Sequence, residues 1–338
     1  MPGITAVFLA FFALLWVGAV TAFVDVATFQ RTPVAAFGPR GAAAMAPQNG
    51  EKVESDSEDK DNSDGAGAVS RRQIFSGVLL RSAAAACGCL GCAAAPRAAW
   101  SLAQITGPPP EALELYDLPR NSLQDAGFAY GMAVGMERYE REARPAKERL
   151  FRKLFAALEG KPEPVVVEVG MGSFPNAHFY KQAKGLDIIG VDPNDSMTGY
   201  ATGSAALAGL FPDDSLRIVH GVSEALPLAD ASCDAVVCTL TLCSVVDPAK
   251  SVAEIRRVLK PGGKFLFWEH VLSETDPGLA QQQILMTPNQ VKFADGCHLD
   301  RRTGDVIRAA GFQDLDMEYF ELKNARLINP TVCGIATA

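Results

Sequence analysis

The sequence lacks a basic stripe with interleaved aromatic residues. Its 31 lysines and arginines are outnumbered by 39 aspartates and glutamates, which leaves a formal net charge of −8. Binding to nucleic-acid phosphates requires concentrated positive charge. We therefore expect no nucleic-acid partner.

The cysteines lack the spacing of a zinc site. Cys233, Cys238 and Cys243 lie five residues apart on and just after an expected strand, so they cannot all face one metal ion. Three further cysteines, Cys87, Cys89 and Cys92, lie close together in the N-terminal part, without histidine or acidic residues beside them. We expect no metal, and nothing in the pattern requires disulfides.

Composition divides the chain in two. Up to about residue 110 it is rich in alanine, glycine and serine and has little amphipathic periodicity. Beyond that point apolar runs alternate with charged stretches, as in a globular α/β domain. We assign residues 111–338 to one folded domain, which is long enough to bury a sizeable core.

Three segments precede that domain. Residues 1–24 contain an uncharged run from 4 to 24, which suits a signal peptide or a membrane anchor. Residues 25–69 begin with a transit-like stretch and continue into an acidic run, 51–64, that we interpret as a disordered linker. Residues 70–103 place Arg71 and Arg72 before an alanine-rich apolar run, as a twin-arginine signal does, with a second membrane-associating helix as the alternative.

Together these segments resemble the bipartite plastid leaders of algae with secondary plastids. They predict a plastid location, in the thylakoid lumen or associated with a membrane through the apolar segments. An endomembrane anchor is the alternative. The oligomeric state is left open.

Five apolar runs predict the parallel strands of a sheet. They are Val165–Val169, Asp187–Asp192, Leu216–His220, Cys233–Cys238 and Lys264–His270. We expect helices at 132–159, with a break near Pro145, and at 174–184, 195–209 and 248–259, and two more strands near 314–322 and 331–337. This alternation predicts an α/β fold, with a Rossmann-like, doubly wound, mostly parallel seven-stranded sheet and an antiparallel final strand.

The first predicted strand ends in a glycine turn. Gly170 and Gly172 let the backbone turn tightly and approach a ligand without a Cβ in the way. Asp192 ends the next strand about 20 residues later, where an acid accepts hydrogen bonds from a ribose diol. A dinucleotide dehydrogenase would have a third glycine at position 175, which is proline here, so the pattern departs from that class.

Later blocks resemble the type 11 methyltransferase family. They are VSEALPLAD at 222–230 and EIRRVLKPGG at 254–263, of which LKPGG is the most specific piece. Longer stretches resemble the thiol S-methyltransferase group (methyltransferase-like seven) and its plant relatives, over about residues 130–338: VVVEVGMGSFPNAHFY, GVDPN, CDAVVCTLTLCSV, LKPGGKFLFWEHV, FADGCHLDRRT and PTVCGIATA. The resemblance implies a class I enzyme that uses S-adenosyl-L-methionine (SAM).

Resemblance and geometry together assign the residues that contact SAM. The expected contacts are Glu168, Gly170, Gly172 and Ser173 at the methionine end, Asp192 and Pro193 at the ribose, Val222 and Ser223 at the adenine, and Thr239 and Leu240 after the fourth strand. Glu168 could instead anchor the glycine turn from behind. Two residues depart from the family: Phe174 replaces a glycine beside the methionine site, and Val222 replaces an aspartate that contacts adenine.

His270, Asp295 and His298 are the candidate catalytic residues on the acceptor side. Positioning and desolvation supply most of the catalysis of methyl transfer, and a base helps only if the acceptor must lose a proton. His270 ends the fifth strand near the expected methyl group, and a structural histidine is the alternative. Asp295 and His298 lie in a loop that resembles the family's acceptor segment, where a structural role is the alternative for His298 and Cys297 is expected to be inert.

Three functions follow from these expectations. The first is methyl transfer from SAM to a small apolar molecule, for which the resemblance implies a thiol. The second is a quinone- or lipid-type C- or O-methyltransferase. The third is a degenerate SAM-fold protein that binds without turnover.

Overall fold

The computed structural model describes residues 105–107 and 110–338 of the chain. The segments predicted at 1–24, 25–69 and 70–103 lie outside these residues, so the assignments made for them stay predictions. Within the described part, no helix has both the length and the apolar character needed to cross a bilayer.

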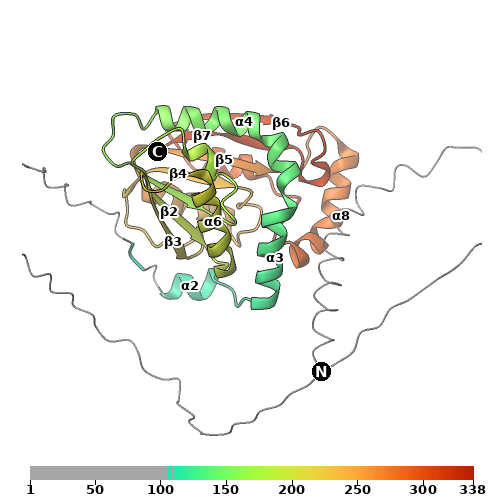
Figure 1. Cartoon of the computed structure of the whole chain (residues 1–338). Helices are drawn as coiled ribbons and strands as arrows, with labels where there is room; N and C mark the ends of the chain where they lie inside the picture. Colours follow the sequence, from blue (N-terminus) through green and yellow to red (C-terminus); the bar gives the residue numbers. More distant parts are fainter. Residues whose placement is uncertain (1–104, 108–109) are drawn as a thin grey trace, which may run out of the picture. The chain divides into compact units, whose positions relative to one another are not determined.

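Seven strands of the described chain form one sheet in the order β3-β2-β1-β4-β5-β7-β6 (Figure 1). They are β1 (Val165–Val169), β2 (Asp187–Asp192), β3 (Ser215–His220), β4 (Cys233–Thr239), β5 (Leu259–His270), β6 (Asp314–Phe320) and β7 (Thr331–Thr337). Strands β1 to β5 pair in parallel, whereas β7 runs antiparallel to both β5 and β6. The predicted fold is confirmed, including its antiparallel final strand.

Helices cover both faces of the sheet. Helices α4 (Glu137–Ala156), α5 (Ala177–Tyr180) and α6 (Thr198–Ala208) pack on one face, and α7 (Pro248–Val258) and α9 (Thr303–Ala309) pack on the other. Strands β1 and β4 are buried on both sides, which explains why they are mostly apolar runs rather than alternating ones. Helices α2 (Pro110–Tyr116), α3 (Ser122–Gly135) and α8 (Pro277–Phe293) complete the described domain.

The helix predicted at 132–159 differs from the observed one. The break falls at Met136, between α3 and α4, and α4 continues through Pro145. Pro145 is exposed, so water can bond the carbonyl group that its missing N–H leaves unpaired. The helix predicted at 174–184 is also shorter than expected, since only Ala177–Tyr180 is α-helical.

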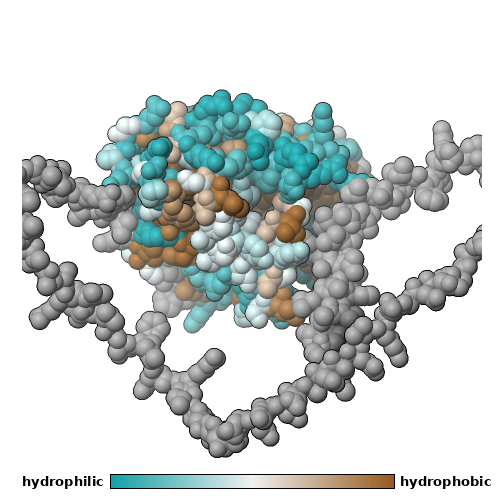
Figure 2. All heavy atoms as spheres, viewed as in Figure 1, coloured by the Kyte–Doolittle hydropathy of each residue, from teal (hydrophilic) through white to brown (hydrophobic). Residues whose placement is uncertain are grey.

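The surface reflects this arrangement. Hydrophilic side chains dominate the part of the molecule over α4, whereas apolar side chains appear lower on the same face (Figure 2). Among the exposed apolar residues are Leu207 of α6, Leu123, Tyr130 and Val134 of α3, and Ile284, Leu285 and Phe293 of α8.

Candidate active site

The carboxyl ends of β1, β2, β4 and β5 lie next to one another in the sheet. Register pairs Val169 with Val191 and with Cys238, and Thr239 with Trp268, so the loops after these strands share one edge. In open α/β sheets this edge carries the ligand site at the switch in strand order, which here falls between β1 and β4.

The glycine turn after β1 has the backbone conformation that the sequence predicts. Gly170 and Gly172 have φ values of 62° and 55°, in the left-handed region that favours glycine. A Cβ added at Gly170 would lie 2.2 Å from Thr241 Oγ1, because Thr241 packs directly over the turn. A Cβ at Gly172 would meet only the carbonyl oxygen of Gly170, at 4.0 Å, so the space beside Gly172 is open.

Asp192 ties the end of β2 to the glycine turn. Its Oδ2 accepts a hydrogen bond from the backbone N–H of Gly172 at 2.8 Å, and its Oδ1 accepts one from the N–H of Asn194 at 2.8 Å. Burial raises the pKa of the Asp192 carboxyl to about 6, although these two hydrogen bonds oppose the shift. Each oxygen keeps a lone pair for a further donor.

The segment before α3 borders this corner. Asn194 Nδ2 donates to the carbonyl oxygen of Asp125 at 3.1 Å, which fixes the start of α3 over the turn after β2. A pocket of about 330 Å³ lies between the two segments, and Pro193 and Ser196 belong to its lining. Pro193 thus lies beside Asp192 at the edge of this pocket. A larger surface groove, of about 780 Å³, lies on α7 and α9, among residues that carry none of these features.

Val222 and Ser223 follow β3 at the same edge. The backbone N–H of Gly221 donates to the carbonyl oxygen of Asp192 at 3.3 Å. This bond brings the loop to the ribose corner, the end of β2 where Asp192 is predicted to bind the ribose. The side chain of Val222 is buried, and its carbonyl oxygen accepts from the N–H of Ala225. The buried hydroxyl of Ser223 has no hydrogen-bond partner among the described residues.

These residues fit SAM. The open space at Gly172 admits a ligand close to the backbone, and the Asp192 carboxylate can accept from a ribose diol. The buried hydroxyl of Ser223, unpaired within the described domain, offers a donor and an acceptor to an adenine ring. The contacts themselves remain predictions.

Glu168 lies behind the glycine turn. Its Oε1 accepts from Asn176 Nδ2 at 2.9 Å, its Oε2 accepts from the Tyr180 hydroxyl at 2.6 Å, and the side chain is buried. Burial raises the pKa of the Glu168 carboxyl to about 7, against the effect of these hydrogen bonds and of Lys147. This placement suits the alternative in which Glu168 anchors the turn.

Ser173 and Phe174, at the end of the glycine turn, contact different parts of the domain. The carbonyl oxygen of Ser173 accepts from the Ser204 hydroxyl of α6 at 2.7 Å, and the Ser173 side chain is nearly buried. Phe174 has a positive φ of 57°, and its fully buried ring packs edge-on against Tyr180 at 5.2 Å between centroids. The Phe174 ring therefore belongs to the core beneath the turn, and its effect on SAM binding stays a prediction.

Thr239 and Leu240 occupy the end of β4. The Thr239 hydroxyl accepts from Asn176 Nδ2 at 3.0 Å and so belongs to the polar cluster behind the turn. Leu240 has a positive φ of 53°, and its N–H donates to the carbonyl oxygen of Trp268 at 2.8 Å. Both residues thus lie at the site's edge, where the loop after β4 turns away from the sheet.

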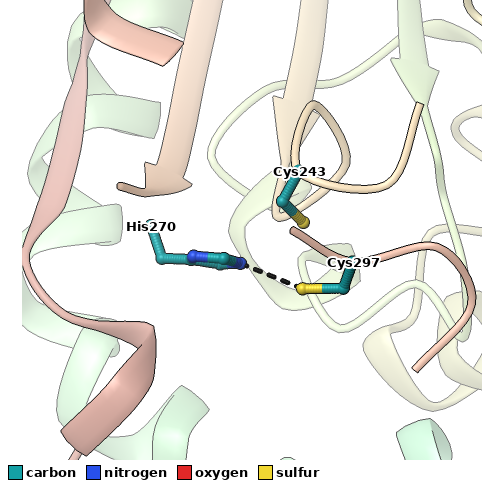
Figure 3. Close-up of side chains that lie close together, drawn as sticks. All are labelled: Cys243, His270 and Cys297. Atoms are coloured by element: carbon teal, nitrogen blue, oxygen red, sulfur yellow. Dashed lines mark hydrogen bonds between the residues drawn. The ribbon is translucent and has the colours of Figure 1, made fainter. Parts of the chain in front are cut away.

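On the side where the sequence predicts the methyl acceptor, the structure brings together His270 and two cysteines (Figure 3). His270 Nε2 lies 3.2 Å from Cys297 Sγ, and Cys243 completes a buried cluster whose ligand atoms all lie within 4.8 Å of one another. Cys297, expected to be inert, is therefore a hydrogen-bond partner of the leading catalytic candidate.

Asp295 and His298 have other partners. The Asp295 carboxylate forms an ion pair with Arg120 at 2.7 Å, which also binds Asp125. His298 Nδ1 lies 2.8 Å from the carbonyl oxygen of Gly296, within its own loop. Of the three catalytic candidates, only His270 lies in the cysteine cluster, and no hydrogen bond or ion pair within the described domain joins it to Asp295 or His298.

Several residues around the candidate site have no local signal in the sequence. Lys147 of α4 donates to Glu140 at 2.8 Å and to Asn176 at 3.2 Å, which links α4 to the polar cluster behind the turn. Thr241 covers Gly170, and Cys243 joins a cluster whose members come from separate loops. Only the positions of these loops in space reveal such groupings.

The strand order, the glycine turn after β1 and the acid that ends β2 define the fold and cofactor site of a class I SAM-dependent methyltransferase. The family described as "Methyltransferase domain" matches residues 167–267. Thiol S-methyltransferase TMT1B of Rattus norvegicus is 34% identical over 192 residues, which cover 57% of this chain and 78% of the relative. TMT1A of Homo sapiens is 31% identical over 201 residues, which cover 59% and 80%.

The chain belongs to the SAM-dependent methyltransferase family that includes these TMT1 proteins. Its cofactor is SAM. Among solved structures, a SAM-dependent methyltransferase of Methanosarcina mazei matches at 20% identity and a TM-score of 0.41, and covers 52% of this chain and 93% of that chain.

Proposed function

We propose that this methyltransferase transfers the methyl group of SAM to the sulfur of a small, apolar thiol. The observation that carries the proposal is the 34% identity to thiol S-methyltransferase TMT1B, which extends over 78% of that relative. A match of 192 residues is longer than the stretch 167–267 that the methyltransferase family model matches.

Apolar surface near the acceptor loops supports a small, apolar substrate. Helix α3 begins beside the ribose corner, and Leu123, Tyr130 and Val134 are exposed along it. Helix α8 ends at the loop that carries Asp295 and Cys297, and Ile284 and Phe293 are exposed on it. Transfer of an apolar molecule from water to such surfaces lowers the free energy.

The residues of the chain have distinct tasks in this reaction. SAM supplies an electrophilic methyl group on a sulfonium. The glycine turn and Asp192 hold and orient the cofactor, and the polar cluster around Glu168 fixes that turn from behind. The buried loop ends around His270 exclude water from the acceptor side, which favours an uncharged transition state formed from an anion and a cation.

A product assay with matched acceptors tests the proposal. SAM with a deuterated methyl group is incubated with benzenethiol, phenol or hydroquinone, and labelled products are measured by mass spectrometry. We expect a rate at least about tenfold higher for the thiol than for either hydroxyl compound, which corresponds to about 1.4 kcal/mol of selectivity. Faster methylation of hydroquinone would instead support the quinone-type reading, and labelling in an Asp192→Ala control would expose contamination.

We also propose that the N-terminal segments direct the enzyme to a plastid, where the apolar runs associate it with a membrane or carry it into the thylakoid lumen. The support is the order of the uncharged run, the transit-like stretch and the twin-arginine-like segment. Fluorescent fusions of residues 1–103 and of the full chain, expressed in an alga with secondary plastids, test this. Fluorescence confined to the endomembranes would support the alternative anchor.

A further inference from the structure

Three loops converge on the cluster formed by Cys243, His270 and Cys297. Cys243 lies in the loop after β4, His270 ends β5, and Cys297 lies in the loop after α8. Their sulfur and nitrogen ligand atoms all lie within 4.8 Å of one another, and all three residues are buried. In Figure 3 the Cys297 thiol points toward the imidazole ring of His270, and the Cys243 sulfur lies on the same side, next to the Cys297 sulfur.

Hydrogen bonds hold the two cysteine loops against each other. The backbone N–H of His298 donates to the carbonyl oxygen of Cys243 at 2.8 Å. Arg301 donates to the carbonyl oxygens of Leu242 at 2.6 Å and Val245 at 2.7 Å, on either side of Cys243. A Cβ at Gly296 would lie 2.8 Å from the carbonyl oxygen of Ser244, so only glycine permits this approach.

The donor set is the one that zinc prefers. Two cysteine sulfurs and one histidine nitrogen form the three-ligand set of an open zinc site, in which the fourth position takes water or substrate. Ligand sulfurs around tetrahedral zinc are about 3.8 Å apart, given Zn–S bonds of about 2.3 Å. The observed spread of up to 4.8 Å therefore needs only small side-chain rotations.

Charge favours the same ion. Two thiolates neutralise Zn²⁺, so the buried site would carry no net charge, whereas a buried thiolate pair without the ion would be costly. A disulfide between the cysteines would leave the imidazole without a role in the cluster, although its Nε2 lies 3.2 Å from Cys297 Sγ.

We propose that Cys243, His270 and Cys297 bind one zinc ion whose fourth position takes the sulfur of the acceptor thiol. The acceptor part rests on the proposed thiol methylation. On coordination the thiol releases its proton to solvent and binds as a thiolate. A sulfur lone pair forms the new bond to the methyl carbon, the bond from that carbon to the sulfonium breaks, and its electron pair stays on the sulfur of S-adenosylhomocysteine. The neutral thioether product then leaves the zinc.

Zinc titration of the full chain tests the site. Cys87, Cys89 and Cys92 are changed to serine throughout, and a phosphine replaces thiol reductants. The chelator-treated protein is titrated with Zn²⁺ against a chromophoric chelator. We expect one zinc per chain, and an affinity at least about 100-fold weaker in Cys243→Ala, His270→Ala and Cys297→Ala. Cys333→Ala, which removes a buried thiol of β7 outside the cluster, should bind zinc normally.

SAM affinity serves as the check that each variant is folded. The proposal fails if the reduced, SAM-binding parent takes up no zinc, or if all three variants take it up as well as the parent does. The Cys333→Ala control separates a specific site from general thiol chemistry.

Cobalt substitution tests the open position. Co²⁺ in the site should show thiolate-to-metal charge-transfer absorption, and benzenethiol should raise it by about half as two thiolates become three. Phenol should leave it unchanged. Absorption that saturating thiol does not alter, or thiol methylation at full rate by zinc-free protein, would overturn the role of zinc and leave thiol methylation standing. Zinc and thiol binding without methylation would overturn the proposed function and leave the site standing.

Discussion

Among single residues, Asp192 is the one on which the predicted SAM site depends most. Its carboxylate accepts from Gly172 and Asn194, and burial raises its pKa to about 6, above the value of about 3.9 in an unfolded chain. Ionising this group therefore costs folding stability as the pH rises from about 4 to about 6. Hydrogen bonds from a ribose diol would offset that cost, because they favour the charged form.

The affinity for SAM should consequently depend on pH. Below about pH 6 the Asp192 carboxyl is protonated and loses acceptor capacity, so the Kd for SAM should rise by up to about tenfold per pH unit on acidification. Calorimetric titrations between pH 5 and pH 7.5 measure this. An Asp192→Asn variant should bind weakly at every pH, and a flat wild-type profile would show that SAM binding does not change the protonation of Asp192.

A Phe174→Gly variant tests whether the Phe174 ring belongs to the core or reaches the SAM pocket. Phe174→Gly would relieve a positive φ but leave a cavity against Tyr180, and cavities left by buried aromatic rings cost about 3–5 kcal/mol. Relief of the backbone strain returns about 1 kcal/mol. We expect a net destabilisation of about 2–4 kcal/mol in urea unfolding, with the Kd for SAM within a few fold of wild type. A variant of unchanged stability but much tighter SAM binding would mean that the ring does reach the pocket.

At the scale of elements, the polar cluster connects α4, the turn after β1 and α5. Lys147 of α4 bonds Glu140 and Asn176, and Asn176 bonds Glu168 of β1 and Thr239 of β4. The cluster is buried, so its members depend on one another for hydrogen bonds. Helix α4, which precedes the glycine turn in the sequence, thus helps to fix that turn.

Lys147→Met should be costly for that reason. It leaves the carboxylates of Glu140 and Glu168 without a buried cation, and breaking one partner of such a pair costs about 3–5 kcal/mol. Lys153→Met, also on α4, removes only an exposed ion pair with Asp316 and should cost less than about 1 kcal/mol. Urea unfolding of both variants measures the difference, and equal losses would contradict the coupling of α4 to the site.

At the scale of the whole molecule, local patterns predict the scaffold. Runs such as VVVEV and DIIGVD match β1 and β2 to the residue, because buried parallel strands are apolar throughout and end at glycine or a polar residue. The glycine turn and Asp192 follow from backbone requirements that only a few residue types meet. The resemblance to a family then adds the cofactor.

The side-chain clusters around the candidate site depend on contacts between segments that are distant in the sequence, and local patterns do not predict them. His270 and Cys297 are 27 residues apart, and the Lys147–Asn176 bond spans 29, so no short pattern links them. Pro145 is also misleading in isolation, since the cost of a helix proline depends on whether its face meets water. Placement of the Phe174 ring likewise follows from the turn's dihedral angles rather than from its residue type.

Calorimetric titration of SAM into the whole chain, alongside Asp192→Ala and the neighbouring control Asp195→Ala, tests whether Asp192 belongs to the SAM site. Asp195 has a largely exposed side chain whose contact is with His220, so its loss should leave binding intact. We expect micromolar binding of SAM by the wild type and the control, and a loss of at least about 1.4 kcal/mol, or tenfold, in Asp192→Ala. Equal binding by all three proteins, or none by a folded wild type, would contradict the account.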